Sequence, residues 1–207
     1  MPLIKSKAPA PAGEAPDRDK IAAAITQGSV DERFAAARAA ADLPSGLEIL
    51  RQALAQETEP RVREAIFTSL GRIRTPASAA VVVPCLTSDE PDVRTGALDA
   101  LRAMPDATAP LLAGLLGDAD ADIRVLACEL VRGQPAEAAN DLLAALLTSE
   151  TEVNVCGAAI DVLAEIGAPA ALPVLAQCAA RFPDDPFLAF AIGMARDRIG
   201  SQAGSRD

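Results

Sequence analysis

A fifteen-residue pattern recurs along this chain at a nearly constant interval, and that recurrence restricts the possible folds more than any other feature. The arginine positions of successive copies are separated by 30, 31, 30 and 32 residues, and the last copy carries cysteine there. They are Arg33, Arg63, Arg94, Arg124 and Cys156. Small and branched apolar residues accompany each position at helical intervals. Such a period is typical of stacked helical hairpins.

A second apolar segment, long enough for about three helical turns, lies between successive copies. Proline or a small polar residue stands at its start, as at Thr75-Pro76 and Pro105-Asp106. Proline suits the first helical turn, where its missing N–H has no hydrogen bond to lose. Each repeat is therefore predicted to be helix, tight turn, helix. With a first helix over 17–27 and a last over about 186–199, we expect twelve helices in six hairpins.

The motif Val-Arg-x-x-Ala-Ala-x-x-Leu, preceded by an acidic turn and followed by Ile-Gly-x-Pro-Ala, resembles the bacterial HEAT-like repeat, also called the phycobilisome-lyase HEAT-like repeat. It is matched by Val62-Arg63, Val93-Arg94 and Ile123-Arg124, and by the Ile-Gly-Ala-Pro-Ala run at 166–170. The resemblance covers residues 17–200. It implies an all-α fold, a right-handed α–α superhelix or α-solenoid, of the kind found in lyases, adaptors and scaffolds.

The two ends of the chain lack the repeat pattern. Residues 1–16 contain Lys5, Lys7 and an Ala-Pro run but no apolar stretch of secretory length, so we expect a disordered tail rather than a leader or anchor. A second disordered tail is expected over 201–207. No segment reaches the roughly 18 to 20 apolar residues that a membrane span requires. A short binding or tethering role for the first tail stays open.

The four cysteines are predicted to be core residues. Cys85, Cys128, Cys156 and Cys178 form no Cys-x-x-Cys pair, and the chain contains no histidine. A zinc site would therefore need all four thiolates or carboxylates. Cys128 falls at a core position of its copy, where a buried thiol behaves as a small hydrophobe. We expect no metal, no cofactor and reduced thiols, which fits a cytoplasmic protein.

The recurring arginines are predicted to form a structural ladder. An acidic residue precedes three of these arginines by four residues, and Glu152 likewise precedes Cys156, so each arginine can reach the turn acid of its own or the adjacent repeat. The predicted ladder comprises Arg33, Arg63, Arg94, Arg124, Glu59, Glu90 and Asp120. The alternative is a stripe of ligand-binding arginines.

Signals for catalysis and for nucleic-acid binding are weak. The chain has no Gly-rich phosphate loop, no His-Glu-x-x-His and no Gly-x-Ser-x-Gly, and no histidine to act as general base. Its net charge of −10 opposes phosphate recognition, which depends on a positive surface. We therefore expect a non-catalytic protein that binds no nucleic acid.

The second helix of each hairpin lines the concave face of such a stack. Its outward positions lie five residues after each arginine position, with two further arginines beyond. These concave-face residues are Arg38, Thr68, Asp99, Arg102, Glu129, Arg132 and Asp161. Opposite charges one turn apart partly neutralise each other in the middle of the row. Its C-terminal part leans acidic.

Two functions are compatible with these features. The first is an adaptor or scaffold whose concave face binds another protein through a basic or mixed-charge segment. The second, implied by the resemblance alone, is a bilin-lyase-like or tetrapyrrole-handling helper. A bilin would need a broad apolar groove with an Arg, Asp or Cys to hold it, and the absence of Tyr, Trp and His counts against this function.

Overall fold

The structure of the protein is a computed structural model that describes residues 17–204. In this part of the chain all regular structure is helical. The first helices of the hairpins are α1 (Arg18–Gln27), α3 (Gly46–Leu54), α5 (Pro76–Val82), α7 (Pro105–Leu116), α9 (Ala136–Ser149) and α11 (Leu172–Arg181). The second helices are α2 (Val30–Ala40), α4 (Pro60–Ile73), α6 (Pro91–Arg102), α8 (Ala121–Val131), α10 (Val153–Ile166) and α12 (Pro186–Gly204). The 3-10 helix η1 (Val83–Thr87) continues α5, and η2 (Pro169–Ala171) precedes α11.

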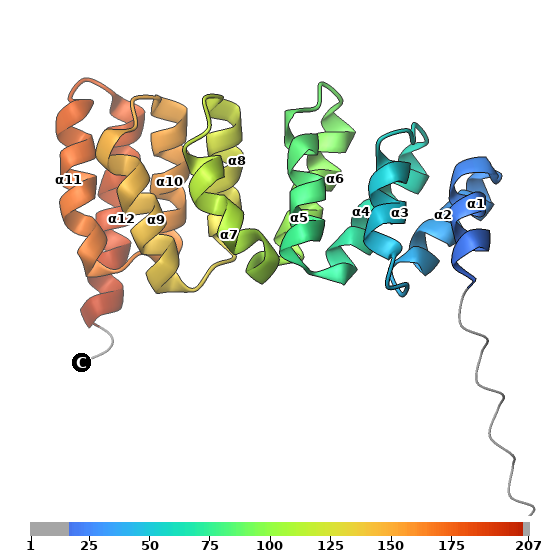
Figure 1. Ribbon diagram of the computed structural model, residues 1–207. Helices are drawn as coiled ribbons and strands as arrows, with labels where there is room; N and C mark the ends of the chain where they lie inside the picture. The colour runs from blue at the N-terminus through green and yellow to red at the C-terminus, as the bar shows by residue number, and fades with distance from the viewer. Residues whose placement is uncertain (1–16, 205–207) are drawn as a thin grey trace, which may run out of the picture.

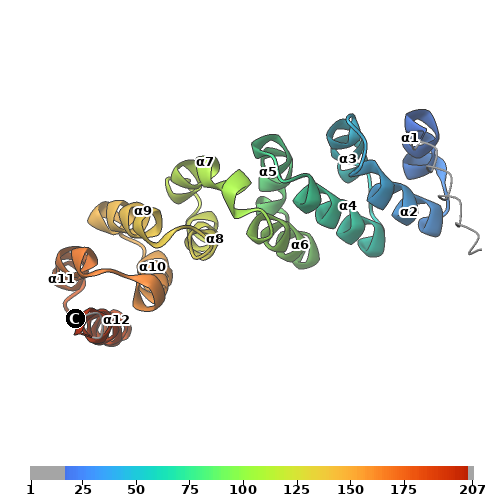
Figure 2. The ribbon, with the colours of Figure 1, turned by 90° about the horizontal axis from the view of Figure 1, so that it is seen from below.

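The predicted fold class, an α–α superhelix of six hairpins, is confirmed. The hairpins stack side by side from α1 at one end to α11 and α12 at the other (Figure 1). Viewed along the helices, the stack bends into an arc, with the odd-numbered helices on the outer side and the even-numbered helices on the inner side (Figure 2). The second helices therefore line the concave face.

The predicted limits of the repeat array differ from the structure at the C-terminal end. Helix α12 continues to Gly204, so it passes through the first four residues of the expected C-terminal tail. Residues 1–16 and 205–207, the rest of the expected tails, lie outside the described residues.

Local sequence signals explain where the helices begin. Proline occupies the first turn of α4, α5, α6 and α7. Reciprocal capping boxes start two helices: Ser29 with Glu32 at α2, and Thr75 with Ser78 at α5. In each box both side chains satisfy backbone N–H groups that have no partner inside the helix. These starts need no tertiary contact, which is why the sequence predicts them well.

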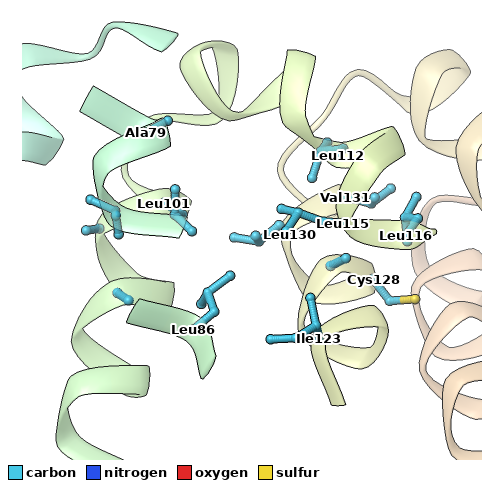
Figure 3. Close-up of a cluster of buried hydrophobic side chains, with 14 of the residues drawn as sticks. Ala79, Leu86, Leu101, Leu112, Leu115, Leu116, Ile123, Cys128, Leu130 and Val131 are labelled. Carbon is cyan, nitrogen blue, oxygen red and sulfur yellow. The ribbon is translucent and has the colours of Figure 1, made fainter. Parts of the chain in front are cut away.

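The core is a continuous layer between the two rows of helices. On α6, the buried residues Val93, Ala97 and Ala100 recur at helical intervals. Across the joint between the third and fourth hairpins, Leu86 and Leu101 face a cluster of aliphatic side chains from α7 and α8 (Figure 3). Because each hairpin buries its apolar side chains against its neighbours, the stability of one repeat depends on the repeats beside it.

Helices α4 and α6 approach closely at Gly96. A Cβ added there would lie 2.8 Å from Cδ2 of Phe67, whose side chain is buried. We therefore expect Gly96→Ala to lower the free energy of unfolding by about 1–3 kcal/mol through overpacking, despite the better helix propensity of alanine. The measurement is urea unfolding followed by circular dichroism.

Gly114→Ala provides the matched control for this substitution. Gly114 lies inside α7, is exposed, and an added Cβ there would meet no atom within 4 Å. Its replacement should raise the free energy of unfolding by about 0.5–1 kcal/mol. If both substitutions stabilised the protein equally, the close packing of α4 on α6 would be wrong.

Candidate functional site: the charged concave face

Six of the concave-face residues predicted from the sequence lie on the five helices α2, α4, α6, α8 and α10, along the inner side of the arc (Figure 2), and the seventh, Arg132, is the C-cap residue of α8. Glu129 and Arg132 are half-buried, and the side chains of the other five are exposed. The structure therefore places them in one row that crosses successive hairpins.

Ion pairs connect the centre of this row from one helix to the next. Arg102 lies 3.5 Å from Oδ1 of Asp99 on its own helix and 3.2 Å from Oε2 of Glu129 on α8. Arg132 in turn lies 3.4 Å from Oε1 of Glu129 and 3.0 Å from Oδ2 of Asp161 on α10, and also pairs with Glu165. Hydrogen bonds to Glu165 and Asp161 raise the pKa of Arg132, although partial burial opposes the rise.

The row nevertheless retains an excess of negative charge. From α6 to α10, four carboxylates share two guanidinium groups. The carboxylates are Asp99, Glu129, Asp161 and Glu165, and the guanidinium groups are those of Arg102 and Arg132. The side chains of Asp99 and Asp161 are each 66% exposed, so both stay accessible to a ligand.

The N-terminal end of the concave face is richer in arginine. The guanidinium group of Arg38 lies 5.9 Å from the ring centre of Phe34, and that of Arg61 lies 4.5 Å from the same ring. Arg61 also pairs with Asp31, and Arg72 pairs with Asp42 at 2.9 Å. Arg61 and Arg72 were not predicted from the sequence, because their partners lie 30 residues away in the preceding repeat.

Open pockets interrupt the concave surface, among them two between neighbouring second helices. The first has a volume of about 550 Å³ between α4 and α6, and Thr68, Arg72 and Asp99 line it. The second has a volume of about 450 Å³ between α10 and α12, and its wall on α12 is largely apolar. Volumes of this size fall within the range of ligand pockets. Neither pocket was predicted from the sequence.

The recurring arginines lie at the edge of the stack, where the loops enter the second helices. Arg63 binds Glu90 of the next repeat at 2.8 Å, as the predicted ladder requires. Arg33 binds Glu57 through two hydrogen bonds of 2.8 and 3.2 Å, and Arg124 binds Glu150 through two of 2.7 and 3.1 Å. Arg94 donates to the carbonyl oxygen of Ser88 at 2.5 Å.

The structure thus corrects the predicted partners of the ladder. Glu59 and Asp120, expected to pair with arginines, are instead the N-cap residues of α4 and α8, and the Asp120 side chain accepts from the N–H of Asp122. The carboxylates that bind Arg33 and Arg124 come from the loop of the following repeat, whereas the loop of each arginine's own repeat contributes backbone carbonyl oxygens.

Glu57 and Glu150 are held as buried anions. Burial of each carboxyl group raises its pKa, but an arginine and two backbone N–H groups donate to the charged form and lower the pKa below its ordinary value. For Glu150 the backbone donors are Thr151 and Glu152, each at 2.9 Å. At Cys156, where the arginine is missing, Arg181 of α11 instead donates to the carbonyl oxygens of residues 147, 148 and 150. These contacts organise the loops at the edge of the stack.

The cysteines lie in the core or beside it. Cys128, Cys156 and Cys178 are buried, and Cys85 is half-buried. Burial raises the pKa of the Cys128 and Cys156 thiols to about 12, so both are protonated at neutral pH. In the described part of the chain, no group of three or more His, Cys, Asp or Glu side chains is arranged to hold a metal ion.

The arrangement defines the protein as an α-solenoid of paired helices with a charged inner surface. Residues 19–102 and 108–194 match the family of HEAT repeats, and the chain belongs to this family. No helix within residues 17–204 has the length and apolar composition needed to cross a membrane.

Several solved structures are similar to this chain. An archaeal HEAT-like repeats protein from Thermococcus onnurineus NA1 is 17% identical, with 87% of this chain and 86% of that chain covered and a TM-score of 0.52. The complex of CpcE and CpcF of phycocyanin lyase from Nostoc sp. PCC7120 is 18% identical over 87% of this chain and 81% of that chain, with a TM-score of 0.38. Human deoxyhypusine hydroxylase in complex with glycerol is 20% identical over 87% of this chain and 83% of that chain, with a TM-score of 0.45. None of the curated proteins matches this chain.

Proposed function

We propose that this protein is a non-catalytic scaffold or adaptor whose concave face binds a segment of another protein. The row of exposed charges that crosses α6, α8 and α10 carries the proposal. Its carboxylates outnumber its arginines, so the segment that fits it best contains basic residues. The residues that would contact the partner are Arg38, Thr68, Asp99, Arg102, Glu129, Arg132 and Asp161.

The paired charges of the row suit it to peptide recognition. Arg102 and Arg132 already bridge neighbouring helices, so the carboxylates between them are held in position before a partner arrives. Preorganised groups lose less conformational entropy on binding than mobile ones. The ion pairs also provide hydrogen-bonding groups for partner side chains of either charge, which agrees with a mixed-charge segment.

The geometry favours this function over the bilin-handling alternative. A bilin would need a broad apolar groove, whereas most of the described concave face is a row of ion pairs. The pocket lined by exposed apolar side chains of α12 lies at the C-terminal end, between the last two hairpins. A visible absorbance shift on mixing the protein with a bilin would support the alternative instead.

The proposal predicts that neutral amides in the acidic part of the row weaken binding of a basic peptide. In the triple variant Asp99→Asn, Glu129→Gln and Asp161→Asn, Arg102 and Arg132 lose most of their partners and the surface becomes positive. We expect affinity for a fluorescein-labelled ten-residue peptide of lysine, arginine and serine to fall about tenfold or more. The expected loss corresponds to at least about 1.4 kcal/mol. Fluorescence anisotropy measures it, and added salt should weaken binding to the native protein, because screening acts over a Debye length of about 8 Å at physiological ionic strength.

The matched control places the same charge change on the outer helices. Asp106, Glu137 and Asp141 are exposed residues of α7 and α9, and their amide variants should bind the peptide with little change. An equal loss of affinity in both triple variants would show that total charge drives binding, and the concave face would not be the site.

A further inference from the structure

Exposed large apolar side chains gather on the concave side of the last helix. In the described part of the chain there are four such residues. Phe187, Phe190 and Met194 of α12 are 59%, 70% and 41% exposed, and Val30 lies on α2, near the opposite end of the stack. Three exposed apolar residues within eight positions of one helix form a patch of the kind that marks an interaction site.

These side chains form one wall of the pocket between α10 and α12. The opposite wall consists of Ala158, Ile160 and Ala164 of α10. Asp161 and Arg198 also line the pocket and supply one charge of each sign. A Cβ added to Gly157 would lie 2.8 Å from Cε1 of Phe187, so the absence of a side chain at Gly157 lets that ring lie directly against α10. The pocket has a volume of about 450 Å³ beside this ring.

The helical register shows that this patch replaces polar residues found in earlier repeats. The buried residues of α12, Leu188, Ile192 and Ala195, have the same spacing as Val93, Ala97 and Ala100 of α6. In this register Met194 occupies the position of Asp99. The same comparison with α10, whose buried series starts at Val155, places Met194 at the position of Asp161 and Phe187 at that of Asn154. The charged row thus ends in an apolar position.

We infer that the α10–α12 pocket anchors the bound segment, by taking up two large apolar side chains that adjoin its basic residues. This inference rests on the proposed function and deepens it, because the partner is now an apolar–basic segment. Basic residues would lie along the carboxylates from α6 to α10, and the apolar pair would enter the pocket. Neighbouring helices pack about 8–10 Å apart, so the three steps from α6 through α8 and α10 to α12 cover about 24–30 Å. An extended segment of about ten residues, at roughly 3.3 Å each, is long enough to span them.

Charge and surface composition favour a partner over a second copy of the chain. Two copies would each bring a net charge of −10. Outside the patch, Val30 is the remaining large apolar side chain exposed in residues 17–201 that a second copy could insert. A basic segment meets none of these obstacles.

The test uses the full-length protein and three fluorescein-labelled ten-residue peptides. The first is Lys-Arg-Ser-Lys-Arg-Ser-Leu-Ser-Leu-Ser, whose two leucines share one side of an extended chain. The second has serine in place of both leucines, and the third has serine in place of all lysines and arginines. We expect the first peptide to bind at least about tenfold more tightly than either of the others, because a buried apolar anchor contributes on this scale.

Two protein variants then separate the contribution of the apolar pocket from that of the carboxylates. Phe190→Ala with Met194→Ala should reduce the affinity of the first peptide to that of the leucine-free peptide. Since both side chains are exposed, circular dichroism should show unchanged helix content. Val30→Ala, an exposed apolar residue on α2, is the control and should have no effect. The triple amide variant of the charged row should instead reduce the first peptide to the affinity of the leucine-only peptide.

The outcomes distinguish failure of the anchor from failure of the proposed function. If the leucines add no affinity while the triple amide variant still weakens binding, the α10–α12 pocket is not an anchor, and the charged row remains the binding site. If the triple amide variant changes nothing for any peptide, the proposed function fails. Two further results would overturn the anchor. One is a dimer in sedimentation velocity that the α12 double variant abolishes. The other is tighter peptide binding after removal of residues 1–16, which would assign the pocket to the chain's own N-terminal segment.

Discussion

Replacing Arg124 with alanine is expected to lower the free energy of unfolding by about 3 kcal/mol. Arg124 holds Glu150 of the next repeat through two hydrogen bonds, and it also donates to the carbonyl oxygens of Asp118 and Ala119 at 2.8 and 3.2 Å. The side chains of Arg124 and Glu150 are only 14% and 5% exposed. The substitution would leave a buried carboxylate without its cation and two loop carbonyls without a donor.

Arg63→Ala is the control for this prediction. Arg63 is 13% exposed, but its partner Glu90 is 63% exposed, so water can solvate the carboxylate that the substitution releases. We expect a loss of about 1 kcal/mol, near the upper end for ion pairs with one solvated member. Urea unfolding of both variants measures the difference. Equal losses would mean that burial of the partner carboxylate does not decide the strength of these contacts.

The second large effect is a loss of stability in acid that depends on Glu57 and Glu150. Both carboxyl groups have pKa values below the ordinary value in the folded protein. An unfolded glutamate titrates near a pKa of about 4.3, so the folded state binds fewer protons there than the unfolded state. The stabilisation is fully present above about pH 5 and is lost as the pH falls through about 4.3 toward the folded pKa. Protonation removes both carboxylate charges and weakens both arginine pairs, so the loss should exceed that from either carboxyl group alone.

Thermal unfolding between pH 7 and pH 3 of the double variant Glu57→Gln and Glu150→Gln checks this prediction. The variant should be less stable than the native protein at pH 7 and should lose less stability on acidification. Asp106→Asn with Asp141→Asn removes the same charge from exposed outer positions and should keep the native pH profile. A double variant at Glu57 and Glu150 that followed the native profile would contradict the assignment.

The sequence by itself determined the repeat architecture. The regular arginine positions, the proline residues at helix starts and the apolar spacing are local signals, and each acts within one or two turns of helix. The unit of a hairpin and the number of hairpins therefore follow from them. The same reasoning placed the second helices on the concave side and found the row from Asp99 to Asp161, because a repeat carries its register from copy to copy.

Only the tertiary structure decided which groups meet across the repeats. Glu57 and Glu59 are two residues apart in one loop, yet Glu57 binds Arg33 whereas Glu59 lies at the start of α4. The distance along the chain does not distinguish them, since the choice depends on how the loop turns when the hairpins stack.

The anchor pocket shows the same division between local and tertiary information. Phe187, Phe190 and Met194 are ordinary apolar residues of a helix in the sequence, and nothing local assigns them to the surface. Their exposure follows from the register in which α12 packs on α10, where Leu188, Ile192 and Ala195 take the buried positions instead. Helical periodicity predicts that one side of α12 is buried, but only packing against a particular neighbour determines which side it is.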